Sequence, residues 1–578
     1  MTKTAWYLVQ GQFAPTAAQT LSGFVQLEDG RALPVLPSGR VHEIVDWAPP
    51  AMIPPPLQAR RLGWFERTWR MAWRVLVTRG RLSRAQRRRC SLTLRRLILC
   101  LPEAYRVATR FRGMTYAQWV AEVEPQIHAT FHADRPAAMP RPRIVVLRYG
   151  PAVEPPPLDD SDWLMLLAEG DRLAETALTW FAHEAARHPS AGLIYADDDE
   201  IDAQGRRDRP CFKPDWSYLH LQEVDYIGRA AIISTRALRA AGGLKAENLA
   251  GDTWELLLRV GRLPDIEVHH IPAVLLHRAA NDQPPPRRRV HLPRPDDPPL
   301  VSIIIPTRDA PDLIERCVES VLAKTTYPRY EVLVVDNQSR KSAALRYLQA
   351  LAGHPQVRVL RYDRRFNFSA INNFAVRHAQ GEAICLLNND TEVITPDWLD
   401  EMVGHLAQPK VGVVGARLLF PDGRVQHAGD TVGPGGCANH LHEGIAADAP
   451  GYCQRAVVAQ DLSAVTAACM LTWRDLYLHL GGLNERFLPV AFNDVDYCLR
   501  VRQAGLRVVY TPHAELYHHE SASRSRMRGW RKEFRAWREV RYMRWRWREE
   551  MRHDPYYNPN FSYLRADFML GPWINGRG

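Results

Sequence analysis

The sequence predicts an α/β protein whose largest part is a doubly wound parallel sheet. Residues 301–306 and 331–336 are predominantly apolar runs, which are typical of strands buried on both faces. Residues 357–360 and 383–387 are two further strand-like runs, and segments with helical periodicity lie between the four. Strands that alternate with helices across short loops indicate a parallel sheet covered by helices on each face.

Proline-rich stretches at 49–56, 135–157 and 284–299 divide this chain of 578 residues, which is too long for one hydrophobic core. We expect five parts, at residues 1–56, 57–139, 140–290, 298–524 and 525–578. The parallel sheet belongs to the fourth part.

The first two parts precede the expected sheet. In residues 1–56, apolar and polar residues alternate around turn signals, which predicts a small β-rich module. In residues 57–139, apolar residues recur at helical spacing with arginines between them, which predicts a helical basic region. We favour a helix that packs its apolar stripe on the next domain, and docking on a membrane surface stays open.

Charge and cysteine content limit the partners and the compartment. Lys and Arg number 75 against 64 Asp and Glu, and the resulting charge of +11 favours anionic partners such as phosphates, nucleic acid or acidic lipid. The nine cysteines stand singly, which excludes zinc-ribbon and thioredoxin motifs and favours a reducing compartment. We find no signal-peptide core and no apolar run near the roughly 20 residues that cross a bilayer, so we expect a cytoplasmic protein.

Three strands of the predicted sheet end in polar clusters, at 306–309, 336–339 and 388–390. Ligands of doubly wound sheets bind beyond the carboxyl ends of the strands, so these clusters predict a ligand site. No glycine-rich phosphate loop follows the first strand, which disfavours a dinucleotide-dependent dehydrogenase or a P-loop NTPase.

A second polar group follows in residues 491–524. Asp494 and Asp496 stand at the start of a predicted helix, and His518 and His519 come about one strand later. Together with the cluster at 388–390, these residue types indicate a site for a divalent metal and a diphosphate, with a general base nearby. Such a set suits an enzyme that moves a sugar off an activated nucleotide.

Eight ordered blocks carry a family resemblance, at residues 301–308, 335–337, 365–373, 387–390, 425–429, 463–469, 492–496 and 516–524. Through these blocks, residues 300–524 resemble the family 2 glycosyltransferases, the inverting class with the GT-A nucleotide-sugar fold. The likeness is greatest to bacterial enzymes that build O-antigen and exopolysaccharide chains, often rhamnosyltransferases.

The resemblance implies a role for each matching position. Asp494 would be the catalytic base, and Asp390 would hold Mg²⁺ or Mn²⁺ against the diphosphate with His518 nearby. The family's metal motif begins with Asp where this chain has Asn388, which leaves the metal one charge weaker. The residues implied to contact the donor are Pro306, Thr307, Arg308, Asp336, Asn337, Asn373, Asn388, Asn389 and Asp496, among which Asp336 would bind the nucleobase or ribose.

The chemistry explains these residue types. Mg²⁺ uses one or two protein carboxylates and keeps water and phosphate as its other ligands, so one aspartate can suffice. The acceptor hydroxyl is a weak nucleophile, and a carboxylate must take its proton during the attack. A single displacement inverts the anomeric carbon without a covalent intermediate.

Each of these side chains also has a structural interpretation. Asp390 could cap the following helix, and Asp336 could be a turn residue. Asp494 could be a helix cap, with Asp496 supplying the second role. For the three carboxylates we favour the functional interpretation, whereas His518 is equally a structural histidine or a ligand.

Residues 140–290 resemble the later half of a second, degraded transferase domain. The run at 143–147 stands alone where a full nucleotide-binding half is expected, and Ala168–Asp171 replaces the metal motif. We therefore predict a non-catalytic domain. The acidic run Asp197–Glu200 could be a metal site, but we favour a solvated loop.

Residues 524–552 interleave arginines with aromatic residues. We favour a helix that caps the catalytic domain, with arginine stems covering apolar surface. Contact with anionic lipid comes next, and nucleic acid is the least favoured partner. Residues 554–560 resemble the family's usual closing segment.

These features predict a metal-dependent, inverting glycosyltransferase of bacterial surface polysaccharide or O-antigen synthesis. It would pass a sugar from a nucleoside-diphosphate donor to a glycan, expected to be lipid-linked, with peripheral contact at the inner face of the cell membrane as an open point. The alternative is a non-catalytic carbohydrate-binding or scaffold protein of a polysaccharide assembly complex.

Overall fold

The computed structural model describes residues 24–26, 32–34, 114–133, 142–149, 157–160, 162–249, 251–279, 286–519, 530–563 and 565–571. The chain divides into two compact units, residues 1–95 and 96–578. In the first unit, β1 (Phe24–Gln26) and β2 (Ala32–Pro34) form an antiparallel pair. The helical segment predicted from residue 57 onward lies outside the described residues as far as residue 113.

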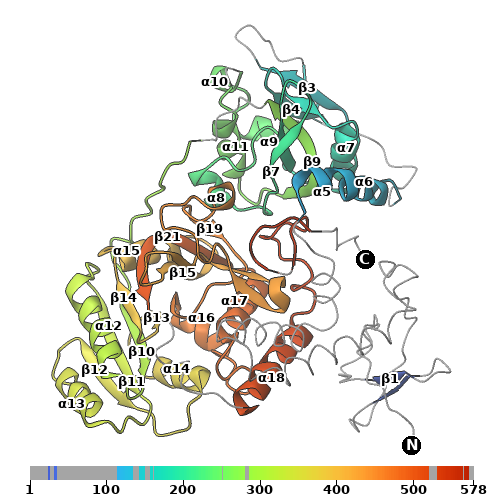
Figure 1. The fold of residues 1–578 in the computed structure, drawn as a ribbon. Helices are drawn as coiled ribbons and strands as arrows, with labels where there is room; N and C mark the ends of the chain where they lie inside the picture. The colour runs from blue at the N-terminus through green and yellow to red at the C-terminus, as the bar shows by residue number, and fades with distance from the viewer. Residues whose placement is uncertain are drawn as a thin grey trace, which may run out of the picture. The chain divides into compact units, whose positions relative to one another are not determined.

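The main sheet holds ten strands between residues 301 and 518 (Figure 1). Its central order is β12 (Val357–Arg361), β11 (Tyr330–Asp336), β10 (Val301–Thr307), β13 (Ala383–Leu387), β20 (Cys469–Trp473), β15 (Val411–Leu419), β21 (Arg507–His518) and β14 (Thr391–Val393). Two short strands, β16 (Val425–His427) and β19 (Gln460–Asp461), pair with β15 and β21. The first four strands are parallel, as predicted, whereas β20 and β14 run antiparallel to their neighbours.

Helices cover both faces of this sheet. The helices are α12 (Pro311–Lys324), α13 (Ser342–Leu351), α14 (Phe368–Val376), α15 (Trp398–Leu406), α16 (Arg474–His479) and α17 (Asn493–Gln503). Successive residues of β10 serve different cores: Ile304 packs in the cluster that contains Ile371 of α14, and Ile303 in the cluster that contains Val321 of α12. This alternation explains the predominantly apolar run at 301–305, because a strand buried on both faces has no solvent side. The predicted α/β fold is confirmed.

The upstream sheet has seven strands between residues 144 and 279. Its order is β3 (Ile144–Arg148), β4 (Trp163–Leu167), β8 (Ala231–Ser234), β6 (Leu193–Ile201), β9 (Val268–Ala279) and β5 (Arg172–Leu173), with β7 (Arg207–Cys211) paired to β6. Its helices are α5 (Tyr116–Glu122), α6 (Glu124–Ala133), α7 (Ala177–Arg187), α8 (Tyr218–Glu223), α9 (Thr235–Ala240), α10 (Ala246–Leu249) and α11 (Thr253–Gly261).

The upstream sheet repeats part of the main sheet. The path β3-β4-β8-β6-β9-β5 has the same sequence of parallel and antiparallel pairs as β10-β13-β20-β15-β21-β14. No described strand of the upstream sheet corresponds to β11 or β12 of the main sheet. The upstream region is therefore a transferase-like α/β fold that is truncated.

The expectation of a solvated loop at Asp197–Glu200 is wrong. These residues form the buried second half of β6, and each carboxylate meets partners from distant parts of the chain. Asp198 pairs with Lys213 at 2.5 Å and with Arg278 at 2.8 Å. Burial alone would raise the pKa of Asp198, but these two cations hold it below its ordinary value. The run can be buried because the fold places positively charged side chains beside it. These side chains come from other parts of the sequence, so the run itself does not show them.

The C-terminal segment adds α18 (Trp530–Arg546) and a following wrap. Val540, Met543 and Trp547 are buried, and the last two belong to the main core, whereas Phe534 and Trp545 are exposed. None of the described helices combines the length and apolar character needed to cross a bilayer.

Candidate active site

Asp336 ends β11 at the carboxyl edge of the main sheet and is 3% exposed. Its Oδ1 accepts a hydrogen bond from the Ser339 N–H at 2.9 Å, and its Oδ2 pairs with Arg361 of β12. A nucleoside that bound this carboxylate would compete with Arg361, whose side chain is 46% exposed and also pairs with Asp363.

The two strand ends beside Asp336 are joined by amide side chains. Asn389 donates from Nδ2 to Oγ1 of Thr307 at 3.0 Å. Asn337 donates from Nδ2 to the carbonyls of Tyr362 and Arg364, and its Oδ1 is buried with no hydrogen-bond partner among the described residues. An unpaired buried acceptor is costly, and a donor group of a ligand would satisfy it. Pro306 is half-buried and Arg308 exposed on the same edge.

Asp390, which follows β13, and His518, the last residue of β21, lie close together at this edge. The His518 Nε2 lies 3.1 Å from Oδ1 of Asp390 and 3.2 Å from Nδ2 of Asn388. The other ring nitrogen, Nδ1, lies 2.6 Å from Oε1 of Gln426, an acceptor that places the ring proton on Nδ1. Nε2 therefore faces the Asp390 carboxylate, and a ring whose Nδ1 donates to Gln426 can offer its Nε2 lone pair to a metal ion.

Asp494 lies in the first turn of α17 and is partly buried. Its Oδ2 accepts from the Ala467 N–H at 3.0 Å and from the Thr466 hydroxyl at 3.3 Å. Burial, and then the negative charge of Asp430, raise the pKa of Asp494 above the ordinary aspartate value. The N-cap residue of α17, Phe492, has a φ of 59°, a left-handed conformation that is uncommon for a bulky side chain.

Two of the predicted donor-contact residues are occupied within the protein. Asn373 exchanges hydrogen bonds with Tyr477, Leu483 and Glu485, so both ends of its amide hold the loop before α17. Asp496 accepts from Trp547 Nε1 at 2.9 Å and from Arg500 Nε at 3.0 Å. The structure therefore brings Asp390, Asn388 and His518 together, whereas it points Asn373 and Asp496 into the packing of the helices.

The structure also brings together a second group of histidines and a carboxylate. His427 of β16, Asp430 of β17 (Asp430–Val432) and His440 of β18 (Ala438–His440) lie together, and the Thr466 N–H is 3.4 Å from His427 Nε2. Thr466 thus lies between this group and Asp494. Spacing could not have shown this, because β17 and β18 form a separate two-stranded sheet whose pairing is a tertiary feature.

Residues 302–434 match the model of glycosyl transferase family 2. An uncharacterised protein, y4gI, of Sinorhizobium fredii is 40% identical over 447 residues, which cover 71% of this chain and 49% of that protein. The O-antigen biosynthesis protein RfbC of Myxococcus xanthus is 35% identical over 446 residues, which cover 70% of this chain and 34% of that protein. The chain thus spans half or less of these relatives.

A solved mannosyltransferase from Pyrobaculum calidifontis, in complex with GDP-Man and Mn²⁺, overlaps 40% of this chain and 60% of its own chain, with 21% identity and a TM-score of 0.30.

Proposed function

Because this chain belongs to family 2 of the glycosyltransferases and has an α/β fold of the GT-A type, we propose that it transfers a sugar from a nucleoside-diphosphate donor to a glycan acceptor in surface polysaccharide synthesis. The observation that carries the proposal is the close approach of Asp390 Oδ1 and His518 Nε2, which are 3.1 Å apart on the sheet edge that also bears Asp336.

The donor set at Asp390 fits a hard divalent cation such as Mg²⁺ or Mn²⁺. One carboxylate and one oriented imidazole leave several coordination positions for water and for the diphosphate. Such an ion, when bound, offsets the negative charge that develops on the departing nucleoside diphosphate. In this arrangement Gln426 has a positioning role, because its acceptor oxygen fixes the His518 tautomer.

Asp494 is the proposed general base. The acceptor hydroxyl oxygen bonds to the anomeric carbon while the bond from that carbon to the diphosphate oxygen breaks. The hydroxyl proton passes to the Asp494 carboxylate, and the nucleoside diphosphate leaves with the bonding electron pair, so the anomeric carbon inverts. The raised pKa of Asp494 makes its carboxylate a stronger base than an exposed aspartate.

The nucleoside is proposed to lie at the ends of β10 and β11. Thr307, Asp336 and Asn337 line this edge, and the unpaired Oδ1 of Asn337 offers an acceptor to the ligand. Pro306, Arg308 and Asn389 complete the proposed pocket.

A lipid-linked acceptor at the inner membrane face is part of the proposal, and the exposed face of α18 supports it. Phe534 and Trp545 are exposed there among arginines, a combination that suits contact with anionic lipid headgroups.

The first test is a panel of nucleotide-sugars, incubated with the purified chain and Mn²⁺, with nucleoside-diphosphate release as the readout. We expect one donor to be hydrolysed slowly without acceptor, and the release to stop when EDTA removes the metal. Saturable binding of glycan together with no binding or turnover of any nucleotide-sugar would favour the non-catalytic scaffold instead.

A further inference from the structure

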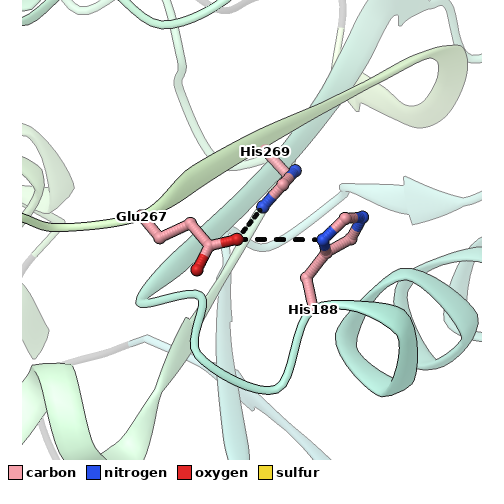
Figure 2. Close-up of side chains that lie close together, drawn as sticks. All are labelled: His188, Glu267 and His269. Carbon is pink, nitrogen blue, oxygen red and sulfur yellow. Dashed lines mark hydrogen bonds and ion pairs between the residues drawn. The ribbon is translucent and has the colours of Figure 1, made fainter.

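Among the described residues, two groups combine histidines with a carboxylate in the manner of a metal centre: His188, Glu267 and His269, and the group His427, Asp430 and His440. In the first group, both imidazoles face one oxygen of Glu267, at 2.7 Å from His269 and 3.8 Å from His188 (Figure 2). The three side chains are 27% to 40% exposed, so water solvates them, and ion pairing explains their arrangement.

The second group, which we call the β16–β18 cluster, is more compact and more deeply buried. The Nδ1 atoms of His427 and His440 are 2.9 Å apart. Oδ1 of Asp430 lies 2.6 Å from the His440 Nδ1 and 3.6 Å from the His427 Nδ1. The side chains of His427 and Asp430 are 1% and 5% exposed.

We propose that the β16–β18 cluster is a binding site for a divalent transition-metal ion of the Zn²⁺ or Co²⁺ type, separate from the site at Asp390. Two imidazole nitrogens and one carboxylate oxygen are a ligand set that such ions favour. The circle through the three atoms has a radius of about 1.8 Å, so an ion about 2.1 Å from each atom fits just above their plane.

The geometry also allows the ion to enter and to keep an open position. The His440 side chain is 38% exposed, whereas the other two ligands are buried, so the cluster opens to solvent on one side. A metal ion would bind the lone pairs of all three atoms at once, in place of the hydrogen bonds that join them.

The position of the cluster relates it to the proposed reaction. Thr466 lies between the two, since its backbone nitrogen is 3.4 Å from His427 Nε2 and its hydroxyl donates to Asp494. The metal site itself can be present whether or not the chain transfers sugar, so the two proposals can fail independently.

Metal binding to the full chain, stripped of ions by chelation, tests the inference without any donor or acceptor. We expect one Zn²⁺ site that competes with a chromophoric chelator, and a Co²⁺ absorption spectrum with nitrogen ligation. The His440→Ala substitution should weaken this binding by about 100-fold, since it removes a ligand outright. Because His440 is partly exposed, this variant is expected to fold, which circular dichroism checks.

Matched variants locate the site. Asp430→Asn should also lose the tight site, whereas His269→Ala removes the corresponding ligand of the exposed group and should keep it. Asp390→Ala should keep it as well. Binding of Zn²⁺ and Co²⁺ that is equal in the wild-type chain and in His440→Ala would overturn the proposal, as would loss of the tight site in His269→Ala or Asp390→Ala.

Discussion

The upstream sheet and the main sheet are two versions of one fold, and they differ at the residues proposed for chemistry. In the main sheet, Thr391 pairs with His518, which brings Asp390 beside the histidine. In the upstream sheet, Arg172 pairs with His277 in the same register, so Asp171 takes the place of Asp390. The backbone arrangement for a metal pair is present in both sheets.

The upstream pair is separated by other partners. Both oxygens of Asp171 accept from Arg229, at 2.8 and 3.1 Å, and His277 Nδ1 lies 2.6 Å from Asp199. In the upstream sheet the Arg229 guanidinium therefore lies where a metal ion is proposed in the main sheet. His277 contacts the buried carboxylate of Asp199 instead. The two sheets share the same strand arrangement, but only the main sheet brings its aspartate and histidine together.

The helices before the last long strand show the same division. Cys498–Val501 in α17 corresponds to Leu257–Val260 in α11, since each sequence places an arginine before a valine. In this correspondence the pairs Asp496–Arg500 and Glu255–Arg259 match, and both are ion pairs one helical turn apart. In the same correspondence, Thr253 of α11 is equivalent to Asp494 of α17. Because the upstream domain has the equivalent of the Asp496–Arg500 pair, we assign this pair a structural role. Asp494 has no equivalent carboxylate in α11, so it is the candidate for chemistry.

The upstream domain still contacts the main one through buried hydrogen bonds. Ser217 donates to Asp461 at 2.7 Å, and Glu223 accepts from the Ala459 N–H at 2.9 Å. Asn558 of the C-terminal wrap donates to Asp197. These buried bonds give the upstream domain a supporting role that does not depend on ligand binding.

The largest expected effect comes from removing the carboxylate that only the main domain has. Asp494→Asn should lower the transfer rate by about 10²- to 10⁴-fold, because the acceptor proton loses its acceptor group. Donor affinity, measured by calorimetry, should stay near that of the wild-type chain. Thr253→Ala changes the corresponding upstream position and should leave the rate almost unchanged. Normal turnover of Asp494→Asn would remove this residue from the mechanism.

A second comparison separates the two aspartates in the shared register. With Mn²⁺ and the preferred nucleoside diphosphate at 100 times its Kd, binding should stabilise the wild-type chain by about 2.7 kcal/mol, seen as a higher Tm. Asp390→Ala should abolish this metal-dependent rise. Asp171→Ala should lower the starting Tm, because it leaves Arg229 without its buried carboxylate, but should keep the rise. The reverse pattern would place the donor site in the upstream domain.

The smallest effect concerns pH. Asp494 must be ionised to accept a proton, and its pKa is raised, so kcat/KM should fall as the pH drops through a value above the roughly 4 of an exposed aspartate. Thr466→Val removes a hydrogen bond to the ionised form and should move this fall to higher pH, whereas Thr466→Ser keeps the hydroxyl and should not. If kcat/KM falls at the same pH in the wild-type chain and in both variants, the pH dependence does not arise from Asp494.

Local pattern was sufficient for much of the fold. The runs at 301–306, 331–336 and 383–387 predicted buried parallel strands, and they are β10, β11 and β13. Because parallel strands end on one edge, the same pattern also placed Asp336 and Asp390 at that edge. The truncation of residues 140–290 could be inferred as well, since the strands that would correspond to β11 and β12 have no matching sequence.

The sequence by itself determined the strands, the edge and the residue types that gather there, because periodicity and strand-end position are local properties of the chain. Only the tertiary structure decided which side chains meet. In the folded chain, Asp197–Glu200 are buried beside cations from distant segments, and Asp496 accepts a hydrogen bond from Trp547. Gln426 contacts His518, and the three residues of the β16–β18 cluster lie together. The partners in each of these contacts come from separate strands, helices and loops. The energy of a buried polar group depends on such partners, and no spacing along the chain encodes them.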